Sequence, residues 1–445
     1  MRRFSTHCAL LAWLLMSAVT ASPARAREAL ISEPLPEGFS VRQSVIDGPV
    51  FADARGRTLY RWPFKVMRNG ITGDPLGESN CTDEPARVSG GLMSPYPPGL
   101  LMPELDTRPA CAAVWPPAIA ADDARATGRW SIITRKDGRK QWALDGAALY
   151  TSVLDERPGD VIGSYTGNHR GDLPALRDPV GPEPDLPPGF LVVSTHKGRL
   201  LRTERGFSVY AQRRGRAAAP CEGDCLQNWE PLPAPASARP RGEWKLITRE
   251  TGELQWSFRG QALFRYKADP RPRAQDGADV PGWKLVYLQE APPDPEGFTV
   301  QVTTGGLVLA DAEGRTIYTY ACGDDAPDQL GCDHPTQTQI YRFALCGAGS
   351  AERCAKNFPY VIAPRGAKAS GLWRVVTIDP RSGRFADAGT PGAERVWAYR
   401  DRPVYTYAGD ERPGDINADN YGEFRAQRHG YKAIWLRNDF VREEG

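Results

Sequence analysis

Two blocks of residues recur three times along the chain, and this repetition constrains the fold more than any other feature of the sequence. Each first block opens with a Gly-Phe pair and has a glycine 16 or 17 residues later, four residues before a tyrosine. Each second block has an aromatic residue four positions after a cysteine and a tryptophan fifteen positions later. These spacings predict three copies of one unit. The repeated phenylalanines, tyrosines and second-block tryptophans are Phe39, Phe190, Phe298, Tyr60, Tyr210, Tyr318, Trp130, Trp244 and Trp373.

The repeated blocks have the pattern of short β-strands. Residues 130–153 contain three runs rich in Ile, Thr, Trp and Tyr, separated by Asp-Gly pairs that favour tight hairpin turns. The pattern predicts strands at 130–135, 140–144 and 147–153, and 244–267 repeats it. Because no stretch keeps a helical period, few helices are expected. We therefore expect an all-β fold of tandem β-meander repeats, with two sub-blocks in each of three units.

The units are expected to span residues 36–171, 187–290 and 295–437, joined by acidic, proline-rich connections that resemble linkers. Two arrangements fit this organisation. One is a propeller-like ring with pseudo-threefold order, in which neighbouring units bury faces against each other. The other is three linked β-modules in a line. The sequence leaves both open.

The N-terminus predicts an exported protein. Arg2 and Arg3 precede an apolar run over residues 9–21, and Ala24-Arg25-Ala26 provides a cleavage site. This is the pattern of a signal peptide, here residues 1–26. No later run offers 18 apolar residues, so no transmembrane segment is expected. The predicted location is periplasmic or extracellular.

Cysteine usage agrees with export. Loss of the signal peptide removes Cys8 and leaves eight cysteines, an even number that indicates disulfides in an exported chain. One bridge is expected in each unit, and Cys322 with Cys332 would add a fourth in the third unit. Structural bridges are favoured over thiol exchange, because none of the pairs has Cys-x-x-Cys spacing. The candidates are Cys81, Cys111, Cys221, Cys225, Cys322, Cys332, Cys346 and Cys354.

A further motif recurs after the last predicted strand of each unit. Tyr150 precedes Asp155 by five residues, and Tyr405 precedes Asp410 in the same way. The middle copy has Phe264 before Asp269. These residues resemble the Y-x4-D motif of a bacterial secreted-repeat lipoprotein family of unknown function. The resemblance covers most of residues 36–437 and implies a fold and an exported location, but no chemistry. The chain lacks the family's lipid-attachment cysteine after the apolar run.

Carboxylates supply the candidate metal site. The string DERPGD occurs at 155–160 and at 410–415, where its first Asp is expected to accept backbone N–H bonds and shape the turn. After the second copy, Asp415, Asn417 and Asp419 alternate as at the start of a calcium loop. The twelfth position is Ala426 rather than Glu, so this is not an EF-hand. Calcium is a weak expectation, and no other cofactor is expected.

The remaining features favour a binding role. A formal net charge of +2 argues against a nucleic-acid partner. No nucleophile elbow, phosphate loop or haem motif is present. The recurring tryptophans are expected in the core, or alternatively along a cleft for a sugar or a peptide. We expect a non-catalytic binding or scaffold module of the cell envelope, with an envelope protein or glycan as partner. The alternatives are an accessory of periplasmic redox or metal handling and a carbohydrate-active hydrolase.

Overall fold

The computed structural model describes residues 30–67, 70–84, 110–164, 178–213, 220–321, 334–422 and 430–436. Most of the secondary structure in these residues consists of short antiparallel strands, and the described helices have at most eight residues. The expected all-β fold is confirmed. None of the described helices has the length and apolar character needed to cross a membrane. The expected signal peptide at 1–26 lies outside the described residues.

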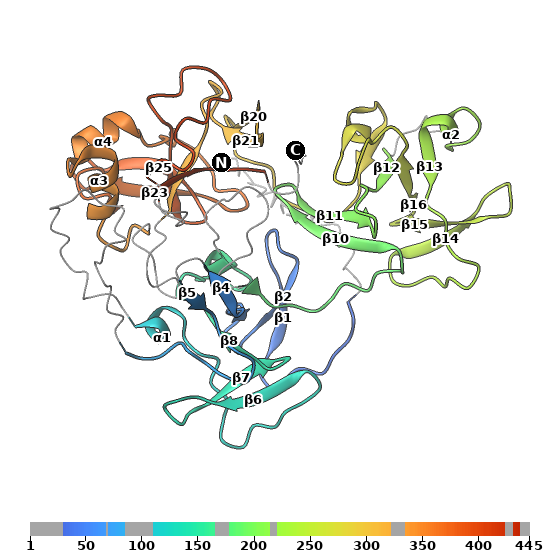
Figure 1. Ribbon diagram of the computed structural model, residues 1–445, viewed down its shortest axis with the longest axis horizontal. Coiled ribbons are helices and arrows are strands. Elements are labelled where there is room, and N and C mark those ends of the chain that lie inside the picture. Colours follow the sequence, from blue (N-terminus) through green and yellow to red (C-terminus); the bar gives the residue numbers. More distant parts are fainter. Residues whose placement is uncertain are drawn as a thin grey trace, which may run out of the picture.

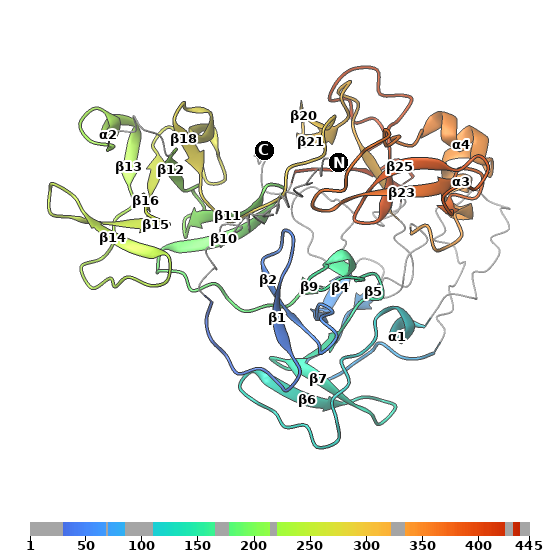
Figure 2. The ribbon, with the colours of Figure 1, turned by 180° about the vertical axis from the view of Figure 1, so that it is seen from behind.

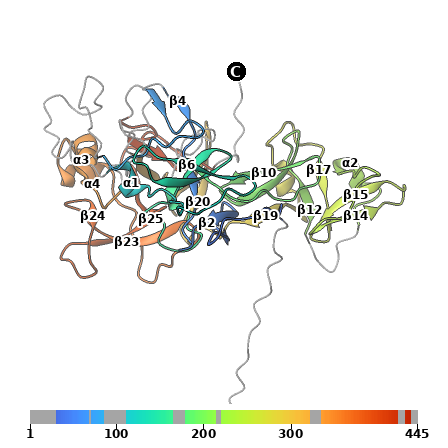
Figure 3. The ribbon, with the colours of Figure 1, turned by 90° about the horizontal axis from the view of Figure 1, so that it is seen from below.

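Strand pairing divides the described chain into three segments, which form three lobes (Figures 1 and 2). We define the first segment as residues 30–184, the second as 185–290 and the third as 291–436. Every pair of named strands and every isolated bridge between described residues lies within one segment. Seen from below, the second segment extends away from the other two (Figure 3).

The first segment combines an antiparallel sheet with two hairpins and two short helical turns. In sheet order, its main strands are β6 (Trp130–Thr134), β7 (Lys140–Leu144), β8 (Ala147–Tyr150), β3 (Tyr60–Arg61) and β9 (Asp178–Pro179). The hairpins and turns are β1 (Ser40–Gln43) with β2 (Pro49–Ala52), β4 (Lys65–Met67) with β5 (Gly70–Thr72), α1 (Cys111–Val114) and η1 (Ile162–Ser164). The meander predicted from 130–153 is therefore present as β6, β7 and β8.

The second segment contains three small sheets. The first has β10 (Phe190–Thr195), β11 (Gly198–Thr203) and β19 (Tyr287–Glu290), and the second has β14 (Trp244–Thr248), β15 (Leu254–Phe258) and β16 (Gln261–Ala262). The third sheet and the helical turns are β13 (Trp229–Pro231), β17 (Phe264–Tyr266), β12 (Tyr210–Gln212), β18 (Trp283–Leu285), α2 (Cys225–Asn228) and η2 (Asp276–Asp279).

The third segment has the largest sheet and the longest helices among the described residues. In sheet order its strands are β24 (Arg384–Phe385), β23 (Trp373–Asp379), β25 (Glu394–Tyr399), β26 (Arg402–Tyr405), β22 (Tyr318–Ala321) and β27 (Gly430–Ala433). The remaining elements are β20 (Thr299–Thr303), β21 (Gly306–Ala310), α3 (Ile340–Gly347) and α4 (Ala351–Asn357). The side chain of Ser350 caps α4 by accepting the N–H of Arg353.

Equivalent hairpin turns in the three segments use residues with positive φ, which the tight turn between two strands requires. Glycine adopts this conformation readily, and Asp-Gly pairs predict it in the first segment. In the third segment Asp401 takes the glycine position, with φ of 61°. The paired turn residues are Asp145 and Gly146, Arg259 and Gly260, and Arg400 and Asp401.

The turn between β1 and β2, residues Ser44–Gly48, joins the first segment to the other two; we call it the tip (Figure 1). Ile46 at the tip is only 6% exposed and packs in the same hydrophobic cluster as Leu309 and Trp373 of the third segment. The Gln289 side-chain amide of the second segment donates to the carbonyls of Ser44 and Val45, each at 2.8 Å. One hairpin of the first segment thus contacts both of the others.

Candidate functional site

The aspartate of the repeated Y-x4-D motif accepts a hydrogen bond from a buried tyrosine in each segment. These tyrosines lie in the first sequence block of each repeat, and all six side chains are buried. We call the three contacts the Tyr–Asp pairs. The hydroxyl-to-carboxylate distances are 2.7 Å for Tyr60 and Asp155, 2.8 Å for Tyr210 and Asp269, and 2.7 Å for Tyr318 and Asp410.

Strand pairing explains why the tyrosine meets this aspartate. The strand that carries the tyrosine pairs with the strand on which the motif begins, so that Tyr60 lies opposite Tyr150. Tyr210 opposite Phe264 and Tyr318 opposite Tyr405 repeat the arrangement. The chain turns back after the motif, and its aspartate then reaches the tyrosine hydroxyl. The motif therefore closes a loop onto a neighbouring strand.

The aspartates of the first and third segments also hold the chain that follows them. Asp155 accepts the backbone N–H of Ile162 at 2.9 Å, and Asp410 accepts that of Asn417 at 3.0 Å. The first aspartate in DERPGD accepts backbone N–H groups as expected, but these groups follow the Pro-Gly turn rather than lie within it. The last aspartate of the string, Asp160 or Asp415, accepts the N–H of the arginine three residues earlier.

Burial sets the protonation of these pairs. It raises the pKa of Asp155 to about 7 and also raises the pKa of Asp269 and Asp410. Burial, together with the neighbouring carboxylate, raises the pKa of Tyr60 as well. Both oxygens of Asp155 and of Asp410 accept hydrogen bonds, one from the tyrosine hydroxyl and one from a backbone N–H group. The Tyr–Asp pairs consequently act as connections within the fold.

The first residue of the motif has a different partner in each segment. Tyr150 donates its hydroxyl to Asp74 at 2.5 Å and lies 2.8 Å from the Ser79 hydroxyl. Phe264, which lacks a hydroxyl, packs edge-on against Trp283 at 5.1 Å. In the middle copy an aromatic neighbour thus takes the place of the polar partners that Tyr150 has.

In the third segment this neighbourhood contains a buried cation. Arg342 is 1% exposed, and its guanidinium lies 5.0 Å from the ring centroid of Tyr405. It donates to the Tyr360 hydroxyl at 2.6 Å and to the side-chain amide oxygen Oε1 of Gln339 at 3.3 Å. Aromatic faces and neutral oxygens thus solvate this charge.

The candidate calcium ligands make hydrogen bonds to their own loop and to strand β27. Asp415 accepts the N–H groups of Glu411 and Arg412, and Asp419 accepts that of Ala433. The Asn417 amide donates to the carbonyl of Gly409. No cluster of three or more His, Cys, Asp or Glu side chains suited to a metal occurs in the described part of the chain. A calcium ion at this loop, which includes an Asn ligand, stays a prediction.

Three disulfides join the cysteines in the pairs expected for the three units. They are Cys81–Cys111, Cys221–Cys225 and Cys346–Cys354. Five of these six cysteines are buried, and Cys225 is half-buried. Cys322 and Cys332 lie outside the described residues.

The eight recurring tryptophans are all buried, which confirms their assignment to the core. Five of them pack with the repeated phenylalanines, as in the stacked pair Phe298 and Trp373 with ring centroids 4.1 Å apart. These residues are Trp115, Trp130, Trp142, Trp229, Trp244, Trp256, Trp373 and Trp397.

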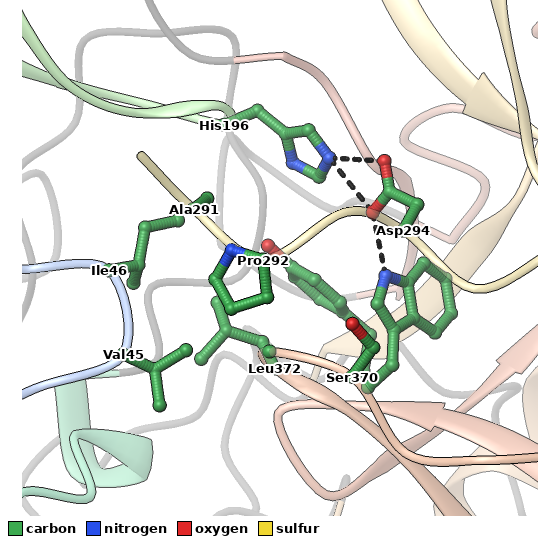
Figure 4. Close-up of a pocket in the computed structure, with 11 residues that line it drawn as sticks. Val45, Ile46, His196, Ala291, Pro292, Asp294, Ser370 and Leu372 are labelled. Atoms are coloured by element: carbon green, nitrogen blue, oxygen red, sulfur yellow. Dashed lines mark hydrogen bonds and ion pairs between the residues drawn. The ribbon is translucent and has the colours of Figure 1, made fainter. Parts of the chain in front are cut away.

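A polar contact lies where the second and third segments meet (Figure 4). His196, in the turn between β10 and β11, has Nε2 2.9 Å from the Asp294 carboxylate. The Trp373 indole N–H donates to the same carboxylate at 2.8 Å. Val45 and Ile46 of the tip line the adjoining cavity, whose volume is about 20 Å³, room for little more than a water molecule. We call His196, Asp294 and Trp373 the junction triad.

Sequence reasoning missed the junction triad, although a signal for it exists. Four residues before the repeated phenylalanine, the first two copies have Leu35 and Leu186, which pack on hydrophobic clusters. The third copy has Asp294 at this position. A charged residue in place of a core leucine marks a contact that the other copies lack. Burial alone would raise the pKa of Asp294, but the hydrogen bond and charge of His196 outweigh it and lower the pKa.

Comparison with known proteins relates parts of the first and third segments to one protein family. The profile of a family described as a secreted repeat of unknown function matches residues 131–169 and 391–429. The first stretch contains Tyr150 and Asp155, and the second contains Tyr405 and Asp410. Comparisons with curated proteins and with solved structures gave no match. The resemblance found in the sequence is thus confirmed, and the chain carries the secreted repeat of unknown function at residues 131–169 and 391–429.

Proposed function

We propose that the protein is an exported, non-catalytic binding or scaffold module of the cell envelope, in which three copies of one unit form a ring with pseudo-threefold order. A partner protein or a glycan of the envelope binds to its surface. The loops and strand edges at the outside of the three lobes supply the contacts, since loops on a rigid scaffold commonly carry binding functions.

The observation that supports this role is the position of the repeated motif. The Tyr–Asp pairs are buried in all three segments, and their aspartates bind backbone N–H groups or a tyrosine. The residues that define the repeat therefore stabilise each lobe. Because the residues that define the repeat stabilise the fold, surface residues can vary without loss of the lobes. This property suits a binding scaffold.

Contacts between segments support the ring. Gln43 of the first segment donates to Gln289 of the second at 2.7 Å. His196 of the second contacts Asp294 of the third, and Arg400 of the third donates to the Val161 carbonyl of the first at 3.3 Å. Each segment thus contacts the other two, which favours a ring over modules in a line.

Binding to fractionated envelope material tests the proposal. The purified protein without residues 1–26 is labelled and incubated with isolated peptidoglycan and with solubilised envelope proteins. We expect saturable binding to one fraction, and we expect that mass spectrometry finds no chemical change in that fraction. Reduced and unfolded protein is the control. Absence of saturable binding, or release of a cleaved product, would contradict the proposed role.

A further inference from the structure

Residues 359–363 of the third segment form a short extended stretch, which two isolated bridges join to β25 and β26. The other edge of this stretch is unpaired, and we call it the open edge. On one side, Val361 donates to the carbonyl of Val404 and Ala363 donates to that of Arg395. These bonds alternate along the strand, so the N–H and C=O groups of Tyr360 and Ile362 point to the other side. They have no backbone or side-chain partner among the described residues. Ile362 is 56% exposed.

The equivalent strands of the other two segments are blocked by proline. In the second segment, Leu232 and Ala234 donate inward, and both outward positions are proline, Pro231 and Pro233. In the first segment the outward positions are Pro117 and Ile119. Proline has no N–H and is a common means of protecting a sheet edge from further strands. The outward N–H donors therefore number two in the third segment, one in the first and none in the second.

A cavity adjoins the open edge. Its volume is about 330 Å³, and its walls include Phe298, Tyr360, Ile362 and Trp397. This volume lies within the range typical of ligand sites. Aromatic and aliphatic walls beside unpaired backbone groups are suited to an extended peptide, whose backbone completes the sheet while alternate side chains enter the cavity.

The rim of the cavity carries negative charge. Glu296, Asp311 and Glu313 line it together with one cation, Arg315. Arg315 is engaged by Asp311 at 2.7 Å and by Glu313 at 3.2 Å. Glu296 has no ion pair within the described ranges. One cation against three carboxylates leaves the rim complementary to a basic side chain.

We propose that the open edge at Tyr360–Ile362 binds an extended segment of a partner protein by strand addition, with apolar side chains in the cavity and a Lys or Arg side chain beside Glu296. This inference rests on the proposed binding function and specifies where a protein partner docks. The first and second segments do not offer the same complete edge. Their prolines restrict strand addition to the third lobe.

A synthetic pool of nine-residue peptides with randomised sequences tests the proposal. The pool is captured on the immobilised protein, and bound peptides are sequenced. We expect at least tenfold enrichment of peptides with alternating apolar residues and a Lys or Arg, and loss of this enrichment in Ile362→Pro. This substitution copies Pro233 of the second segment and leaves the inward bonds of Val361 and Ala363 in place. Ile119→Pro in the first segment is the matched control and should retain the enrichment.

Two further measurements keep the test decisive. Methylation of alternate backbone nitrogens in an enriched peptide should weaken its binding to the unaltered protein at least tenfold, whether or not Ile362→Pro folds. Glu296→Gln should reduce the preference for basic peptides. Equal binding by Ile362→Pro, enrichment of acidic peptides, or no enrichment would overturn the proposal. If envelope binding persists in any of these cases, the proposed function stands and its surface lies elsewhere.

Discussion

The Tyr60 hydroxyl lies 2.7 Å from the Asp155 carboxylate, although 95 residues separate the two along the chain. The corresponding residues of the second and third segments repeat this contact across 59 and 92 residues. The length of chain between tyrosine and aspartate therefore varies while the contact is kept. Insertions within a segment are accommodated outside the Tyr–Asp pair.

Removing the tyrosine hydroxyl should destabilise the fold. Tyr60→Phe leaves a buried oxygen of Asp155 without its donor, and we expect a loss of about 1–3 kcal/mol in the free energy of unfolding. Tyr318→Phe should have a similar effect in the third segment. Urea unfolding followed by tryptophan fluorescence measures both. Phe207→Leu in the second segment, which alters neither the Tyr60 pair nor the Tyr318 pair, is a control for general repacking. An unchanged unfolding midpoint in Tyr60→Phe would show that the pair does not stabilise the lobe.

The stability contributed by Asp155 should depend on pH. Burial raises its pKa to about 7, above the value of about 3.9 for an unfolded chain. The folded protein thus retains a proton that the unfolded chain releases. The stabilising contribution is full below about pH 4 and is lost as the pH rises to about 7.

Asp155→Asn, which cannot titrate, isolates this effect. Urea unfolding of the protein and of the variant at several pH values gives the difference between their free energies of unfolding. We expect this difference to shift in favour of the variant from about pH 4 to about pH 7 and to stay level above that range. A difference that does not vary with pH would be inconsistent with the raised pKa.

The junction triad should control how the second segment is held against the third. Asp294→Leu restores the residue type of Leu35 and Leu186 but removes the acceptor of His196 and Trp373. We expect a loss of about 1–3 kcal/mol and faster hydrogen exchange in the β10–β11 turn. Asp294→Asn keeps a carbonyl oxygen for the indole and should cost less. Unaltered exchange in Asp294→Leu would mean that other contacts fix the junction.

The lowered pKa of Asp294 predicts how the stability contributed by the junction triad depends on pH. Its folded pKa is below the unfolded value, so its stabilising contribution is present above about pH 4 and is lost as the pH falls further. The advantage of the protein over Asp294→Leu should accordingly shrink on acidification. Urea unfolding at about pH 3 and at about pH 6 measures this change.

Ile46 should matter more to the third segment than its position in the first suggests. Its side chain is packed in the cluster that contains Leu309 and Trp373, and Ile46→Ala should cost about 2–5 kcal/mol. Hydrogen exchange should rise in β21 and β23 of the third segment. Ile46→Val, which removes one methyl group, should cost about 1 kcal/mol. Increased exchange confined to the first segment would contradict the role of the tip.

Local features of the fold could be predicted from the sequence. The β6–β7–β8 meander follows from alternating strand residues and from Asp-Gly pairs, because a tight turn needs positive φ at adjacent positions. Asp145 and Gly146 have this conformation. The core tryptophans could also be predicted, because their spacing repeats within short stretches of the sequence. Helices α3 and α4 cannot be predicted in this way, because elements of eight and seven residues give too short a periodic signal.

Contacts between distant residues could not be predicted in the same way. Tyr60 and Asp155 each belong to a repeated motif, but a single sequence does not reveal that these two motifs are in contact. His196 recurs in neither of the other segments, and its contact with Asp294 depends on how two lobes pack. Asp294 could be noticed only as a departure from leucine, once the copies are aligned on Phe298.

The tip also bears on the order in which the chain matures. A polypeptide is made and exported from its N-terminus, so the hairpin that carries Ile46 is complete long before the strands that surround this side chain. Until the third lobe forms, an apolar side chain at the end of a hairpin remains in contact with solvent. The nascent protein thus passes through a stage in which the tip exposes an apolar side chain. The third segment, which emerges after the other two, buries this side chain. Truncation near the C-terminus would leave this side chain uncovered and make the shortened chain prone to self-association.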